Sequence, residues 1–165
     1  MPDGLYELDA LAWTEQQASL LRRLAAGERV NDAVDWPNVI VEIEALGRSE
    51  LHGCTSLLRH AMAYLLKLHA WPESRAAGHW RGKALAFLDD AHSYFSPSMR
   101  QRINIDAEYA KALRQVRAST DDSGDPRLLP AVCPFTLDGL IIAEPDLAEL
   151  EARLAGPMPG GVQTD

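Results

Sequence analysis

The segment EIEALGRSE, residues 42–50, carries the charged side chains whose spacing most suggests chemistry. Glu44 and Arg48 lie four residues apart, in the order that favours an ion pair on a helix surface. We therefore expect a solvated pair worth about a few tenths of a kcal/mol. Glu42 flanks an apolar arc on the same helix, so its carboxylate is expected either at the rim of that arc or in a pocket.

Glu50 is the acidic residue that this pattern does not explain. On a helix it lies inside the apolar arc, with Leu46 and Cys54 one turn away on either side. An ionised carboxylate that is buried alone costs several kcal/mol, so a basic partner must come from another helix or the proton must stay on. We predict a structural ion pair between Glu50 and Arg81. The alternatives are solvent exposure and a reactive or metal-binding carboxylate.

The histidines give no metal-binding pattern. The five are His52, His60, His69, His79 and His92, and no two have H-x-x-x-H or H-E-x-x-H spacing. Only Asp89 and His92 have a spacing that could share a metal on one helix, and we favour a solvated charged turn as their explanation. Glu42 and His60 share a helix face but lie about 27 Å apart along its axis. The sequence therefore predicts no metal site and no cofactor.

Other catalytic motifs are also missing. The chain has no G-x-S-x-G elbow, no phosphate-binding G-x-x-x-x-G-K-[ST] loop and no dinucleotide-binding G-x-G-x-x-G. We therefore predict no catalytic residue. The candidate functional or structural polar cluster is Glu42, Glu50, His60 and Arg81, because these ionisable groups lie on or beside core-facing helix stripes.

The N-terminal half of the chain predicts two helices. The first follows Asp9 and ends at Gly27, a typical residue just beyond a helix C-terminus. The second has Asp35 as N-cap and Pro37 in its first turn, and no proline follows until Pro72. Its apolar arc holds Ile40, Ile43, Gly47, Glu50, Cys54, Leu57, Leu58, Ala61, Leu65 and Leu68. At about 33 residues and 50 Å it exceeds a compact domain of this size, so it either kinks near Gly47 or Gly53 or projects from the body. A projecting part would leave its apolar arc in need of a partner.

The C-terminal half predicts shorter helices. One carries Trp80 through Phe95 and stops at Ser96-Pro97, which is expected to open the next helix, through Arg117. Thr136 is predicted to cap a short helix, and Pro145 to start a last helix that ends at Leu154. The fold class is thus all-α, a helical bundle of about four main helices around one long central helix, with short C-terminal helices.

Length and composition indicate one ordinary globular domain over residues 1–156, with residues 157–165 as a disordered tail. The chain has 165 residues, 47% of them hydrophobic, and a net charge of −8. This charge opposes nucleic-acid binding, and no apolar run is long enough to cross a membrane. Two isolated cysteines and the absence of a signal peptide predict a cytoplasmic protein.

Five blocks of sequence resemble a known bacterial family. They are YELDALAWTEQQASLLR (residues 6–22), NVIVEIEALGRSE (38–50), HAMAYLLK (60–67), HWR (79–81) and CPFTLDGLI (133–141). In this order, over about residues 5–142, they resemble the family called domain of unknown function 29. The resemblance implies an all-helical bacterial protein and no particular activity, and the helix after Pro145 is an extension of the family region.

Two functions are consistent with these observations. The first is a non-enzymatic helical module that binds a protein partner or associates with itself, as the overlong helix with its apolar stripe and the missing catalytic motifs suggest. The alternative is an enzyme, or a protein that binds a small ligand or metal, with a site on the Glu42–Glu50 face of the long helix.

Overall fold

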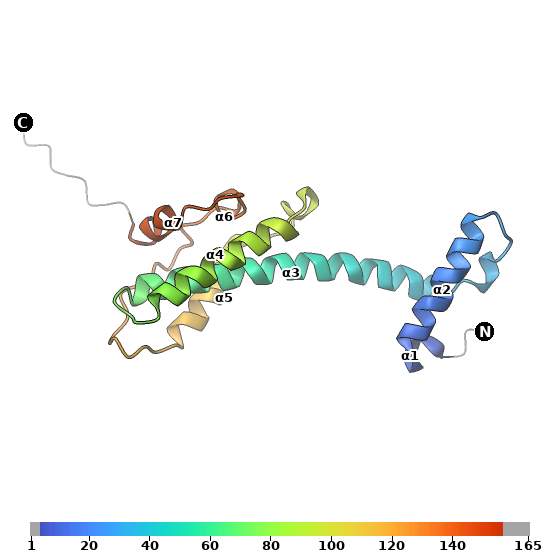
Figure 1. The fold of residues 1–165 in the computed structure, drawn as a ribbon, viewed down its shortest axis with the longest axis horizontal. Coiled ribbons are helices and arrows are strands. Elements are labelled where there is room, and N and C mark those ends of the chain that lie inside the picture. The colour runs from blue at the N-terminus through green and yellow to red at the C-terminus, as the bar shows by residue number, and fades with distance from the viewer. Residues whose placement is uncertain (1–3, 157–165) are drawn as a thin grey trace, which may run out of the picture. The chain divides into compact units, whose positions relative to one another are not determined.

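The computed structural model describes residues 4–156, and all the regular secondary structure in this range is helical. The elements, in chain order, are α1 (Leu5–Leu8), α2 (Ala10–Ala25), the 3-10 helix η1 (Asn31–Ala33), α3 (Trp36–Ala70), α4 (Ala77–Tyr94), the 3-10 helix η2 (Pro97–Met99), α5 (Ile105–Arg117), α6 (Leu137–Leu140) and α7 (Leu147–Leu154) (Figure 1). The predicted all-α class with one long central helix is confirmed.

Contacts divide the chain into two compact units, Met1–Ser49 and Glu50–Asp165, and the division falls within α3. Each unit is described by itself below. The single domain predicted for residues 1–156 stays a prediction. The tail predicted for residues 157–165 lies outside the described residues.

The first unit packs α1, α2 and η1 against the first turns of α3. Its small core consists of Trp13, Val34 and Val39, each less than a tenth exposed. The Tyr6 ring packs edge-on against Trp13, with ring centroids 4.9 Å apart. Because this core is so small, polar contacts make up much of what holds the unit together.

Asp35 is the centre of those polar contacts. Its Oδ2 accepts hydrogen bonds from Trp13 Nε1 (3.1 Å) and Asn38 Nδ2 (2.7 Å), and its backbone N–H donates to Gln17 Oε1 (2.9 Å). The bond from Asn38 is the main reason that the pKa of Asp35 lies below its ordinary value. Burial acts in the opposite direction, and the bond from Trp13 lowers the pKa further. Asp35 thus fastens α2 to the start of α3.

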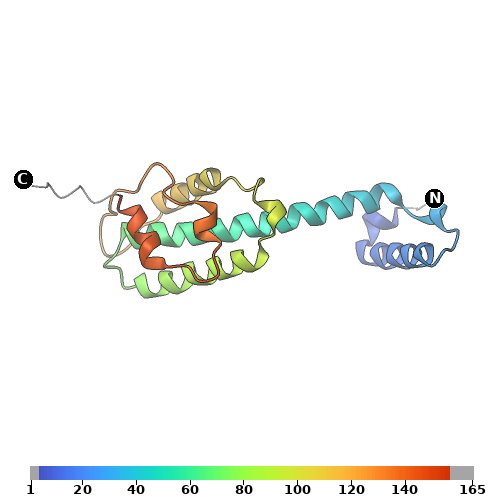
Figure 2. The ribbon, with the colours of Figure 1, turned by 90° about the horizontal axis from the view of Figure 1, so that it is seen from above.

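The second unit is a helical bundle built on the remainder of α3. Figure 2 shows α4 and α5 on either side of α3, with α6 and α7, in red, lying over it. Side chains from all these helices form one core, in which Leu58, Leu65, Leu88 and Leu140 are fully buried. This packing explains the 3.6-residue period of apolar side chains in α3 from Cys54 onward.

Polar groups anchor the long connection between α5 and α6 to the bundle. Trp71 Nε1 donates to Gly124 O (2.8 Å), and the backbone N–H of Arg127 donates to Ala70 O (2.9 Å). Tyr109 donates from its hydroxyl to Pro130 O (2.8 Å). The connection is therefore held against the C-terminal end of α3 despite its lack of regular structure.

Most predicted helix ends are confirmed. The side chains of Asp9 and Thr136 cap α2 and α6 by accepting the backbone N–H three residues on. Gly27 has φ 89°, the left-handed conformation that favours glycine after a helix. Helix α7 starts slightly later than predicted, because Asp146 rather than Pro145 caps it.

The helix predicted to open at Ser96 and Pro97 is wrong. Pro97–Met99 form only one 3-10 turn, and α5 begins at Ile105. The side chain of Asn104 accepts the N–H of Ala107 (3.0 Å) and so provides the actual N-cap. Proline after a cap-type residue therefore marked a turn here and not the helix itself.

Within residues 4–156, no helix combines the length and the apolar character needed to cross a membrane. Both cysteines are free, Cys54 buried in the bundle and Cys133 partly exposed. Burial raises the pKa of both thiols, which keeps them protonated and disfavours a reactive thiolate.

Candidate functional site

The structure does not bring the four predicted site residues together. Arg81 forms an ion pair with Glu151 of α7, in which Nε lies 3.2 Å from Oε1. Glu50 is exposed, and no basic group in the described part of the chain pairs with it. The predicted ion pair between Glu50 and Arg81 is therefore wrong.

The register of the antiparallel α3–α4 hairpin explains this error. A Cβ on Gly53 would lie 3.2 Å from the Tyr94 ring, so the start of this hairpin lies near Glu50. At the other end, Lys67 lies over the Trp80 ring, next to Arg81. Lys67 and Glu50 are 17 residues apart, or about 25 Å along a helix. Arg81 thus lies about five turns from its predicted partner.

Glu42 is engaged inside the first unit. The Tyr6 hydroxyl donates a hydrogen bond of 2.6 Å to Glu42 Oε1. This bond is the main cause of a raised pKa of Tyr6, since deprotonation of the phenol would destroy it and place two negative charges side by side. Glu42 therefore links α1 to α3 and is a rim residue with a structural partner.

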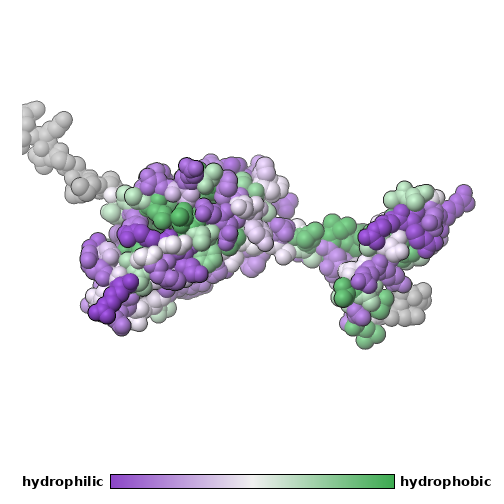
Figure 3. All heavy atoms as spheres, in the orientation of Figure 1, coloured by the Kyte–Doolittle hydropathy of each residue, from purple (hydrophilic) through white to green (hydrophobic). Residues whose placement is uncertain are grey.

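An exposed apolar face lies next to Glu42 on α3. We call Ile40, Ile43 and Leu46 the α3 apolar face. Their side chains are 53%, 66% and 64% exposed, and Trp36 one turn before them is 37% exposed. At 100° per residue the three lie within an arc of about 120°. Figure 3 shows hydrophobic residues at the surface along this part of α3.

Two opposite charges border the α3 apolar face. Glu44 Oε2 and Arg48 NH1 are 3.8 Å apart, and both side chains are about two-thirds exposed. The predicted pair is thus present, but its length and exposure make it worth little. Gly47 lies within the arc of the apolar residues, between Ile40 and Ile43, and nothing stands within 4 Å of the place of its missing Cβ. The α3 apolar face is therefore bordered by one positive and one negative side chain.

His60 lies in a different place, between cavities on the second unit. A cavity of about 530 Å³ is lined by His52, Gly53, Ser56, Leu57, His60, Phe87, Asp90 and Tyr94. The His60 ring packs on Phe87, with centroids 5.2 Å apart. A smaller cavity of about 150 Å³ shares His60 and continues toward Lys67 and α5. His60 thus lines both of these cavities.

A partly buried ion cluster between α3 and α5 was not predicted from the sequence. Glu108 accepts from Lys111 Nζ (2.6 Å) and lies 3.4 Å from Arg59 NH1, and the Glu108 side chain is only 10% exposed. Lys111 is three residues from Glu108, a spacing visible in sequence, but Arg59 is 49 residues away. The Arg59 Nε is buried without a hydrogen-bond partner, which is consistent with a packing role.

A second polar cluster lies in the connection after α5. Asp121 accepts from Ser74 Oγ (2.9 Å) and from the backbone N–H of Ser123 (2.9 Å). Hydrogen bonds from Ser123 are the main cause of a lowered pKa of Asp121. These bonds hold the connection in place. Within the described residues, no group of three or more His, Cys, Asp or Glu side chains is arranged to hold a metal ion.

Comparisons with known proteins agree on the family and the fold. The family model described as domain of unknown function DUF29 matches residues 5–144. A crystal structure of an alpha-helical protein of unknown function from Rhodospirillum rubrum is 29% identical, with a TM-score of 0.67. The alignment covers 92% of this chain and 98% of that protein. No curated protein matches the chain.

Proposed function

We propose that this chain, which belongs to the DUF29 family, is a non-enzymatic helical module that associates with a second copy of itself. The α3 apolar face of one copy packs against the same face of the other. The observation that supports this most is that Ile40, Ile43 and Leu46 are each more than half exposed. Further along α3, the side chains on the same face of the helix are buried in a core. A large apolar patch of this kind is typical of an interaction site.

The burial of these side chains supports a weak dimer. Fully burying an isoleucine or leucine side chain contributes about 1.5–3 kcal/mol. Six such side chains, each already partly covered, contribute about 6–10 kcal/mol in a symmetric pair. Loss of rigid-body freedom costs about 4–15 kcal/mol. At the favourable end of these ranges the net gain is about 6 kcal/mol, which corresponds to a reversible dimer with a dissociation constant on the order of tens of micromolar.

The charges beside the face support a second copy as the partner, in antiparallel orientation. Glu44 and Arg48 lie on the same flank of α3, because they are four residues apart. In an antiparallel pair of helices each flank faces the same flank of its partner, so Glu44 and Arg48 of one copy lie on the flank that faces Glu44 and Arg48 of the other. The two-fold symmetry of such a pair forms the contact twice. Gly47 allows the helices to approach closely.

Variants of the apolar face test the proposal by light scattering after size-exclusion chromatography. We expect the unmodified chain to shift toward dimer as its concentration rises, and Ile43→Glu to stay monomeric because each copy would bury a carboxylate in an apolar interface. Leu128→Glu is the matched control, since Leu128 is 92% exposed in a loop of the other unit. A dimer in Ile43→Glu, or its loss in the control, would refute the proposed interface.

A charge exchange tests the orientation. Glu44→Arg should weaken the dimer by placing like charges on facing flanks, and the further change Arg48→Glu should restore it. In a parallel pair this flank faces the opposite flank of the partner. Glu44→Arg alone would then not weaken the dimer. A Glu44→Arg variant that dimerises as strongly as the unmodified chain would therefore contradict the antiparallel arrangement.

The proposal includes a cytoplasmic location and excludes nucleic acid as a partner. Free thiols at Cys54 and Cys133 support a reducing compartment, and the net charge of −8 opposes binding to phosphate backbones. The alternative of a site on the Glu42–Glu50 face has less support, because Glu42 is bound to Tyr6 and Glu50 is solvent-exposed without a partner among the described residues.

A further inference from the structure

The smaller cavity beside His60 gathers hydrogen-bond donors without a carboxylate. It measures about 150 Å³, and its polar lining is His60, Tyr64, Lys67, Gln115 and Ser119. None of its seven lining residues is acidic, and Lys67 is the one lysine or arginine among them. One permanent positive charge, on Lys67, together with neutral donors suits a ligand with one negative charge.

Lys67 is available for such a ligand. No carboxylate in the described residues lies within ion-pair distance of its ammonium group. The Nζ is held instead over the rings of Tyr64 (5.5 Å) and Trp80 (5.8 Å), which fixes the charge without neutralising it. Asp121 is close enough for Lys67 to lower its pKa, but its oxygens are engaged by Ser74 and Ser123.

The cavity of about 530 Å³ continues from His60 and has a different character. Leu57, Phe87 and Tyr94 supply an apolar and aromatic lining, and the volume is in the range of small-ligand sites. Gly53 keeps room for the Tyr94 ring, which a Cβ at that position would approach to 3.2 Å. Asp90 also lines this cavity and would repel an anion. A negative group is therefore favoured at the Lys67 end alone.

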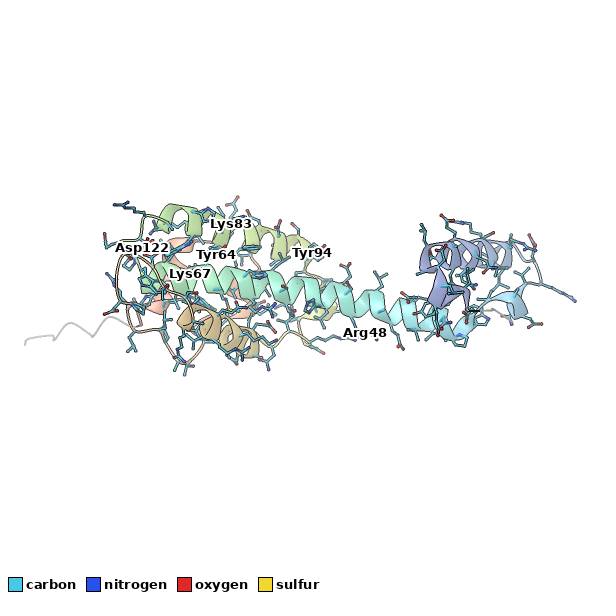
Figure 4. The ribbon with its side chains drawn as sticks, turned by 90° about the horizontal axis from the view of Figure 1, so that it is seen from below. Arg48, Tyr64, Lys67, Lys83, Tyr94 and Asp122 are labelled. Atoms are coloured by element: carbon cyan, nitrogen blue, oxygen red, sulfur yellow. The ribbon has the colours of Figure 1, made fainter. Side chains whose placement is uncertain are left out.

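The smaller cavity is lined by residues of α3 and α5, and the larger by residues of α3 and α4. Figure 4 shows Tyr64 and Lys67 on α3 in this view, with Tyr94 near the end of α4 and Lys83 on the outer side of α4. His60 lines both cavities, so one ligand can contact the two. The geometry places a site for charge next to a site for a ring.

We propose that this groove of the second unit binds a small aromatic carboxylate. The carboxylate accepts hydrogen bonds at the Lys67 end, and the ring packs beside His60 and Phe87, where the two cavities adjoin. This inference is independent of self-association, because none of these residues belongs to the α3 apolar face.

Titration calorimetry of the full chain with phenylacetate tests the proposal. Acetate probes the carboxylate alone, and benzylamine probes the ring without a carboxylate. Inorganic phosphate is the alternative anion. Phenylacetate should bind more tightly than any of the three. Lys67→Met should weaken it about tenfold, the effect of losing one charge-assisted contact. Lys83→Met removes the same charge from α4 outside both cavities and should leave binding unchanged.

Phe87→Leu separates the ring contact from the charge. It should weaken phenylacetate and leave acetate unchanged, and circular dichroism confirms that each variant is folded. The proposal is overturned if phenylacetate does not bind, if phosphate or benzylamine binds more tightly, or if Lys67→Met and Lys83→Met have equal effects.

Discussion

Two parts of one helix differ in what covers their apolar side chains. In the second unit, Cys54, Leu58, Ala61 and Leu65 of α3 are fully buried by α4, α5 and the C-terminal helices. In the first unit, the residues of the α3 apolar face are more than half exposed. Periodicity alone predicts both parts as one core-facing stripe. The difference shows that a helical pattern identifies a face able to pack, while the packing partner depends on the tertiary fold.

The largest effect on stability is expected when a side chain in the buried part of α3 is shortened. Leu58→Ala should lower the free energy of unfolding of the second unit by about 2–5 kcal/mol, because Leu58 is fully buried and its loss leaves a cavity. Urea unfolding followed by far-UV circular dichroism measures this. A loss below about 0.5 kcal/mol, the range of surface substitutions, would contradict the burial described here.

The ion cluster of the second unit and the exposed pair of the first form a similar contrast. Glu108→Gln should cost about 1–3 kcal/mol, because Arg59 and Lys111 lose a charged partner that is largely buried. Glu44→Gln should stay within about 0.5 kcal/mol, since its pair is exposed. Urea unfolding at a concentration where the chain is monomeric compares the two. If the two variants lost the same free energy of unfolding, burial would not explain a difference in strength between the two ion pairs.

The first unit should be sensitive to acid through Asp35. Its pKa is lowered in the folded state, chiefly by Asn38, so the ionised carboxylate stabilises the fold above its ordinary pKa of about 3.9. This stabilisation is lost as the pH falls through the lowered folded pKa. The NMR signal of the Trp13 indole N–H, bound to Asp35, should report the change below about pH 4. If the Trp13 indole signal of the Asp35→Asn variant changed with pH in the same way, its pH dependence would not come from Asp35.

The smallest effect on monomer stability is expected in the α3 apolar face. Ile43→Ser should change the free energy of unfolding of the monomer by about 0.5 kcal/mol or less, because Ile43 is 66% exposed. Urea unfolding in dilute solution measures it. A loss of several kcal/mol would show that Ile43 is already packed within one chain, and the two parts of α3 would then not differ.

The sequence predicted much of the local structure because local chemistry determines it. Asp9, Gly27 and Thr136 end or begin helices through contacts within a few residues, so their roles could be identified without the fold. Asn104 was missed because the cap-type Ser96 and the following proline resembled a helix start more closely. A competing local signal, and not a tertiary effect, caused this error.

The candidate site was less predictable because it depends on how helices align. Glu50 was paired with Arg81 on charge alone, while the register of α3 and α4 places Arg81 beside Glu151 instead. Arg59 and Glu108 pair across 49 residues of sequence, which no local spacing encodes. His60, one of the four candidate residues, lines two cavities, and its role in a site stays a prediction. The cavities around it exist only because α4 and α5 flank α3.

The most direct test of self-association is sedimentation equilibrium of the unmodified chain over a wide concentration range. A mass that rises from the 18.2 kDa of one chain toward twice that value is the predicted result, with the rise abolished in Ile43→Glu. A mass of 18.2 kDa at every concentration would contradict the proposed function.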